Sequence, residues 1–175
     1  MVRIAFVGLP GSGKSTIGRQ LARRRGLAFL DTDHLIENRL GCSIREYFER
    51  EGEASFRDIE QDIIDEVTLT HDGVVSTGGG SVLRPANREH LHQRAQVVYL
   101  RSSPEEIFRR LRHDTNRPLL QVDDPLSRLR DLYQVRDPLY RETAHFVVEI
   151  GRPSAASLLN MVVMQLELAG VLSPQ

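Results

Sequence analysis

The chain has 175 residues, of which 40% are hydrophobic and 27% are charged, and its formal net charge is −1. This length predicts one domain, residues 1–175, that can bury a core. The balanced charge disfavours a general binder of nucleic acid. The most apolar segment, residues 158–172, contains Asn, Gln and Glu, so we expect no membrane span. An apolar run begins at residue 2, which leaves no room for a signal peptide, and Cys42 has no second cysteine to pair with. We therefore expect a cytoplasmic protein.

A phosphate-binding motif opens the chain. Residues 8–15, GLPGSGKS, match the pattern G-x-x-x-x-G-K-[ST] at every fixed position. An apolar run precedes the motif and a helical pattern follows it over residues 15–25, which is the required strand–loop–helix context. Lys14 is the only lysine of the chain, and its slim ammonium suits the space between two phosphates better than a planar guanidinium. The alternative is a glycine-rich turn that binds nothing.

Short apolar runs recur along the chain, at residues 2–7, 27–30, 73–76, 96–100 and 145–150, with helical patterns between them. This alternation predicts an α/β fold, a parallel sheet with helices on both faces and ligands at the carboxyl ends of its strands. Residues 55–69 have apolar side chains at helical spacing. Ser103 and Pro104 are typical of a helix start, and another helix is expected to open at Asp124 or Pro125.

Two carboxylates follow the second strand, in Asp31-Thr32-Asp33. Residues two apart on a strand face the same way, so both side chains are expected to point into the crevice beside the phosphate loop. In phosphoryl transfer such a pair favours Mg²⁺, held by the hydroxyl of Ser15 with carboxylate help, while one carboxylate can serve a substrate hydroxyl. The alternative is that one of the two caps a helix.

Three further segments carry candidate ligands. Arg57 and Glu60 are three residues apart on a predicted helix, where most such pairs are solvated ion pairs. The glycines at positions 78–80 follow the third strand and allow close approach of the backbone to a ligand, or form only a flexible turn. Arg136 lies in VRDPLY and has a helix-surface arginine as its alternative. Residues 112–125 break the helical pattern with HDTNRPLL. We favour a lid over a plain surface loop here, because a lid would bring Arg117 to the transferred phosphate.

Together these segments resemble the shikimate kinase family over nearly the whole chain. The motifs are GLPGSGKST, DTD, SFRDIE, TGGGSV, RPLL and RDPLY, in this order. The resemblance implies a three-layer α/β/α fold of the P-loop type, like nucleoside monophosphate kinases, with a five-stranded parallel sheet. It also implies substrate-binding helices over about residues 33–60 and a mobile lid.

The resemblance also implies an activity, the transfer of the γ-phosphoryl group of ATP to the 3-hydroxyl of shikimate. The protein would then be a monomer that acts on a small molecule in the pathway to chorismate and aromatic amino acids, without nucleic acid or membrane. ATP would be held by Gly11, Ser12, Gly13, Lys14, Ser15, Thr16, Arg110, Arg117 and Arg152, of which Arg152 aligns only loosely. Shikimate would be held by Asp33, Arg57, Glu60, Gly78, Gly79, Gly80 and Arg136. Mg²⁺ would be held by Ser15 and Asp31, and the catalytic residues would be Lys14, Asp33 and Arg117.

Two alternatives stay open on the sequence alone. One is a kinase of the same fold that phosphorylates gluconate or a nucleoside monophosphate. The set of Arg57, Gly79 and Arg136 suits a compact carboxylated polyol better than a second nucleotide. The other is a non-catalytic nucleotide-binding module, which the presence of Lys14, Asp33 and Arg117 disfavours. The six histidines show no ligand spacing, except that His90 and His92 are two apart, and are expected on the surface or in loops.

Overall fold

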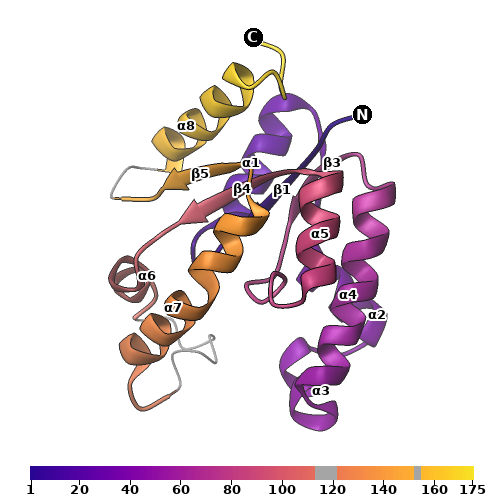
Figure 1. Ribbon diagram of the computed structural model, residues 1–175, viewed down its shortest axis with the longest axis vertical. Helices are drawn as coiled ribbons and strands as arrows, with labels where there is room; N and C mark the ends of the chain where they lie inside the picture. The colour runs from indigo at the N-terminus through magenta and orange to yellow at the C-terminus, as the bar shows by residue number, and fades with distance from the viewer. Residues whose placement is uncertain (113–121, 152–154) are drawn as a thin grey trace.

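The computed structural model describes residues 1–112, 122–151 and 155–175. In these ranges five parallel strands form one sheet, and eight helices surround it (Figure 1). The strands are β1 (Arg3–Val7), β2 (Ala28–Asp31), β3 (Gly73–Ser76), β4 (Gln96–Arg101) and β5 (Phe146–Glu149). They lie in the order β2-β3-β1-β4-β5, and every neighbouring pair is parallel. The predicted α/β fold with a five-stranded parallel sheet is confirmed.

Helices cover both faces of the sheet, as the alternation of strands and helices predicts. They are α1 (Lys14–Arg25), α2 (Thr32–Leu40), α3 (Ile44–Glu51), α4 (Glu53–Thr70), α5 (Pro85–Arg94), α6 (Pro104–Leu111), α7 (Pro125–Thr143) and α8 (Ala155–Leu168). One apolar core joins the sheet to α1 and α8, and a second joins it to α4, α5 and α7. No helix in the described ranges is both long enough and apolar enough to cross a membrane.

The central strand β1 shows why the sequence forms such a sheet. Its side chains alternate between the two cores, with Ile4 and Phe6 in one and Ala5 and Val7 in the other, and all four are at most 1% exposed. A strand buried on both faces is apolar throughout, which explains the near-continuous apolar run. Each large side chain buried in this way stabilises the fold by roughly 1.5–3 kcal/mol.

Local signals set the beginnings of two helices. Ser103 caps α6 by accepting a hydrogen bond from the Glu106 N–H at 3.2 Å, and Asp124 caps α7 by accepting from the Ser127 N–H at 3.1 Å. Both starts agree with the sequence prediction. The helix predicted over residues 55–69 is α4, which begins two residues earlier.

The strand order creates the crevice that the site needs. β1 lies between β3 and β4. The segment that follows β1 therefore starts between two neighbouring segments that run to opposite sides of the sheet. In open parallel sheets ligands bind at this switch point. In the pairing of the strands Asp31 lies beside Ser76, and Ser76 lies beside Phe6. The segments that begin at residues 8, 32 and 77 therefore meet at one edge of the sheet.

Candidate active site

The phosphate loop joins β1 to α1 at this edge. Gly11 and Gly13 have φ angles of 84° and 92°, in the left-handed region where a side chain is strained. A Cβ atom on Gly11 would also lie 2.3 Å from Leu111 Cδ1. The loop ends at the N-terminus of α1, where unpaired N–H groups and the helix dipole favour an anion.

Lys14 begins α1 and reaches back over the loop. Its side chain is buried, and Nζ donates hydrogen bonds to the carbonyl oxygens of Gly8 at 2.8 Å and Leu9 at 2.9 Å. These contacts hold a fixed positive charge against the loop. A buried ammonium that is hydrogen-bonded in this way supplies the charge that a bound polyphosphate needs.

Ser15 and Asp31 are in direct contact. Ser15 Oγ donates to Asp31 Oδ2 at 2.6 Å, and Ser15 Oγ lies 3.1 Å from Ser76 Oγ. Oxygen donors of this kind suit Mg²⁺, which keeps several waters and needs few protein ligands. The described residues contain no group of three His, Cys, Asp or Glu side chains placed to hold a metal. The cluster therefore fits a partly hydrated Mg²⁺ that also binds phosphate, and it does not fit a closed all-protein metal cage.

The geometry of Asp31 and Asp33 differs from the sequence argument. β2 ends at Asp31, whose Oδ1 accepts from the N–H groups of Asp33 at 3.0 Å and His34 at 3.4 Å and so caps α2. Asp33 lies in the first turn of that helix and not on a strand. Both carboxylates nevertheless line one cavity of about 220 Å³ beside the phosphate loop, so the expected crevice position is right although its reason was wrong.

The pKa of Asp33 is raised from 3.8 to about 6, mainly by burial. The negative charges of Asp31 and Glu60 contribute to this rise, and the charge of Lys14 opposes it. The carboxylate packs tightly against the glycine turn, because a Cβ atom on Gly78 would lie 2.6 Å from Asp33 Oδ1. Asp33 is thus a carboxylate tuned close to neutral pH, beside the loop that binds phosphate.

Arg57 and Glu60 form a buried pair and not the solvated pair that is usual at this spacing. Arg57 Nη1 donates to Glu60 Oε1 at 2.8 Å, and the two side chains are 12% and 1% exposed. Ser81 Oγ donates to the other Glu60 oxygen at 3.3 Å. A Cβ atom on Gly80 would lie 2.4 Å from Arg57 Nη2, so a side chain at this position would displace the guanidinium.

The middle of the glycine turn is held from two sides. A Cβ atom on Gly79 would lie 2.7 Å from Pro10 Cδ of the phosphate loop, and the Tyr140 hydroxyl donates to the Gly79 carbonyl at 2.5 Å. Burial raises the pKa of the Tyr140 hydroxyl strongly, and the positive charge of Arg136, one turn earlier on α7, lowers it. The structure therefore brings Arg136 to the same turn as Arg57.

Arg110 lies on the other side of the phosphate loop. It lines a cavity of about 350 Å³ with Ser12, Gly13, Thr16 and Gly151. Its neighbour Arg109 pairs with Glu106 at 2.8 Å. Arg117 and Arg152, and most of the lid predicted for residues 112–125, lie outside the described residues.

Sequence reasoning missed several residues of the site. Ser76 completes the oxygen cluster, Pro10 supports the glycine turn, and the hydroxyls of Ser81 and Tyr140 bind Glu60 and Gly79. Ser76 could have been found as the last residue of the third strand, next to a glycine run. Tyr140 is the last residue of the RDPLY motif, but its contact gives no local signal, because the partner is 61 residues away.

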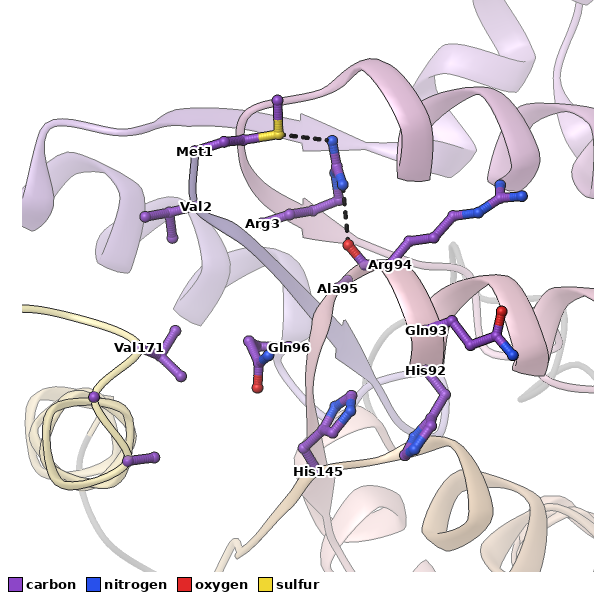
Figure 2. Close-up of a pocket in the computed structure, with 12 residues that line it drawn as sticks. Met1, Val2, Arg3, His92, Gln93, Arg94, Ala95, Gln96, His145 and Val171 are labelled. Atoms are coloured by element: carbon purple, nitrogen blue, oxygen red, sulfur yellow. Dashed lines mark hydrogen bonds between the residues drawn. The ribbon is translucent and has the colours of Figure 1, made fainter.

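A separate hollow of about 580 Å³ lies at the opposite, amino-terminal ends of β1 and β4 (Figure 2). Its wall includes His92 and His145, whose rings stack with centroids 4.2 Å apart. Both side chains are exposed, with His92 on α5 and His145 in the bend before β5, where its Nδ1 accepts the Val97 N–H at 2.9 Å, so the expectation of surface or loop histidines is right for this pair. No predicted site residue lines this hollow.

Comparisons with known proteins agree with the geometry. The family model described as shikimate kinase matches residues 10–167. A shikimate kinase of Paracidovorax citrulli is 59% identical over 174 residues, covering 98% of this chain and 95% of the relative. The chain belongs to the shikimate kinase family. It is therefore a transferase, a kinase that uses ATP in the shikimate pathway of aromatic amino acid biosynthesis.

Other family members extend the match. The shikimate kinase of Ralstonia nicotianae is 56% identical over 171 residues, covering 98% of this chain and 90% of the relative. The structure of a shikimate kinase from Acinetobacter baumannii in complex with shikimate is 45% identical, with a TM-score of 0.90, and covers 97% of this chain and 94% of that one. A shikimate kinase structure from Aquifex aeolicus has a TM-score of 0.83 at 30% identity, with 97% and 98% covered.

Proposed function

We propose that this member of the family transfers the γ-phosphoryl group of ATP to the 3-hydroxyl of shikimate, giving shikimate 3-phosphate and ADP. The observation that carries this proposal is the position of Asp33, which lies in one cavity with the phosphate loop and has its pKa raised to about 6. A group with such a pKa is deprotonated at neutral pH and still accepts a proton from an alcohol as its oxygen attacks phosphorus. Asp33 therefore holds the acceptor hydroxyl and takes its proton.

The guanidinium groups of Arg57 and Arg136 bind the shikimate carboxylate. Arginine matches a planar carboxylate with paired N–H donors, and Glu60 fixes the direction of Arg57 through the 2.8 Å hydrogen bond. The backbone of residues 78–80 approaches the ligand without side chains. A carboxylate clamp beside a carboxylate base suits a compact carboxylated polyol better than a second nucleotide as the acceptor.

The phosphate side of the site is formed by residues 11–16. The loop N–H groups and Lys14 hold the β- and γ-phosphates, and Arg110 borders the cavity that takes the adenosine part. Arg117 from the proposed lid and Arg152 complete the nucleotide site. The hydroxyl oxygen attacks the γ-phosphorus, the bond from phosphorus to the β–γ bridging oxygen breaks, and ADP leaves with the electron pair, so the protein mainly positions groups and neutralises charge.

Ser15 and Asp31 are the residues that would hold Mg²⁺. The bound ion would supply positive charge against the phosphates. Ser15 supplies a hydroxyl oxygen and Asp31 supports the ion. Asp31 keeps its second oxygen on the α2 N–H groups, which fixes its orientation.

We further propose that residues 1–175 act as one domain, a monomer that works in the cytoplasm without nucleic acid or membrane. The net charge of −1 supports the lack of a polyanion partner. The single cysteine requires no oxidising compartment.

Product analysis tests the reaction. Wild-type protein with MgATP and shikimate is expected to give one product whose ³¹P signal couples to the proton on carbon 3. In Asp33→Asn we expect kcat to fall by at least about a hundredfold, the usual contribution of a positioned base, while ATP affinity stays within a few-fold. A product phosphorylated at another hydroxyl, or near-normal turnover of Asp33→Asn, would refute the proposal.

A further inference from the structure

The hydroxyl of Tyr140 contacts the glycine turn of the proposed carboxylate clamp. Tyr140 is fully buried, and its oxygen is 2.5 Å from the Gly79 carbonyl oxygen. A carbonyl oxygen only accepts hydrogen bonds, so the tyrosine hydroxyl is the donor. Burial keeps the pKa of this hydroxyl far above neutral, which keeps the donated proton in place.

Two arginines of the clamp act on the same hydroxyl through their charge. Burial raises the pKa of the Tyr140 hydroxyl, while the positive charges of Arg136, four residues earlier on α7, and of Arg57 lower it. The tyrosine proton is donated to the Gly79 carbonyl, so only the acceptor side of this oxygen is open to a guanidinium, which only donates. The hydroxyl is thus tied to the backbone of the glycine turn, within the field of the clamp arginines.

The link fixes the direction of a backbone donor. In a trans peptide the carbonyl of Gly79 and the N–H of Gly80 point in opposite directions. Holding the carbonyl on Tyr140 therefore turns the Gly80 N–H away from α7. Within the described residues no acceptor is found for the N–H of Gly79 or Gly80, so both donors are available to a ligand.

We propose that Tyr140 is a positioning residue for shikimate: its hydroxyl holds the Gly79 carbonyl and so fixes the direction of the Gly80 N–H that binds the substrate. The inference rests on the proposed function and deepens it. Tyr140 acts through the Gly79–Gly80 peptide and does not take part in the transfer of the phosphoryl group. Its loss therefore weakens the binding of shikimate and leaves the chemical step and the binding of ATP intact.

A neighbouring tyrosine provides a matched control. Tyr99 on β4 is 1% exposed, and its ring packs on that of Tyr140 with centroids 4.9 Å apart. Its hydroxyl donates to Asp137 Oδ1 at 2.7 Å, and Asp137 also accepts from Arg101 and Arg141. Tyr99→Phe therefore removes a buried hydroxyl from the same pair of rings without changing the link to Gly79.

The test compares Tyr140→Phe, Tyr99→Phe and wild type by steady-state kinetics with MgATP and shikimate, and by urea unfolding. For Tyr140→Phe we expect the shikimate KM to rise roughly three- to tenfold, as for the loss of one positioning hydrogen bond. Its kcat and ATP KM are expected to stay within about twofold of wild type. Tyr99→Phe is expected to lose a similar amount of stability with an unchanged shikimate KM.

Three results would count against the inference. An unchanged shikimate KM in Tyr140→Phe would overturn it, because the hydroxyl would then be only structural. An equal rise of KM in Tyr99→Phe would also overturn it, because the effect would then come from general packing. Wild-type protein that releases ADP without any dependence on shikimate would refute the proposed function itself, and this control separates that failure from the other two.

Discussion

Because its pKa is raised, the charged form of Asp33 destabilises the folded protein, although the same carboxylate is the candidate base. Asp33→Asn keeps the shape of the side chain against Gly78 but removes the charge. In the folded protein the pKa lies above its ordinary value, so the folded state binds the proton more tightly than the unfolded state. Stability from this group is therefore full below about pH 4 and is lost as the pH rises through about 6. Asparagine has no such proton to lose.

The size of the effect follows from the shift. The pKa rises from 3.8 to about 6, and one unit corresponds to about 1.4 kcal/mol, so the charged carboxylate destabilises the fold by up to about 3 kcal/mol above pH 6. Asp33 retains some exposure. For this reason we expect Asp33→Asn to raise the free energy of unfolding by about 1–3 kcal/mol at pH 8, and by little at pH 4.

Urea unfolding followed by circular dichroism, without nucleotide or Mg²⁺, measures this difference at several pH values. Asp65→Asn is a control of opposite sign, because the hydrogen bond from Arg94 lowers the pKa of Asp65, so its loss should destabilise the protein above pH 4. The reasoning is refuted if Asp33→Asn is no more stable than wild type at pH 8, or if its gain in stability is the same at pH 4.

Other predictions concern the clamp and the pH dependence. Gly80→Ala places a methyl group 2.4 Å from Arg57. This variant and Arg136→Ala should each raise the shikimate KM at least about tenfold, while the ATP KM changes little. An unchanged shikimate KM in both variants would exclude the clamp. The wild-type kcat/KM should fall as the pH drops below about 6, where Asp33 becomes protonated, and a profile that stays flat to pH 5 would exclude the base. Burial, with the charge of His92, lowers the pKa of His145. The stability that His145 contributes should therefore be full above pH 6.5 and fall as the pH is lowered. His145→Gln should reduce this fall, and a pH dependence of urea unfolding that is the same in the variant and the wild type would contradict the prediction.

The sequence predicted what depends on local pattern. Strands buried on both faces are apolar runs, and the phosphate loop requires glycine at fixed places, so β1, β3 and the loop could be located closely. Asp31-Thr32-Asp33 directly follows an apolar run and was read as the end of that strand, with a helix cap left as the alternative. The Asp31 carboxylate, by accepting two N–H groups, instead begins a helix at that point.

Burial was the property that local patterns could not supply. At a spacing of three residues, Arg57 and Glu60 look like a solvated pair. They are buried because Gly80 and Ser81, about twenty residues later in the chain, pack against them. The link from Tyr140 to Gly79 likewise depends on how α7 packs beside the turn. Such contacts are set by the tertiary fold.

The most direct test of the account is the acceptor dependence of ADP release. A coupled assay with MgATP would compare shikimate with gluconate, AMP and no acceptor. The account predicts release that depends on shikimate and stays at the no-acceptor rate with the other two compounds. Tight ATP binding with no release above that rate, or faster release with gluconate or AMP than with shikimate, would contradict it.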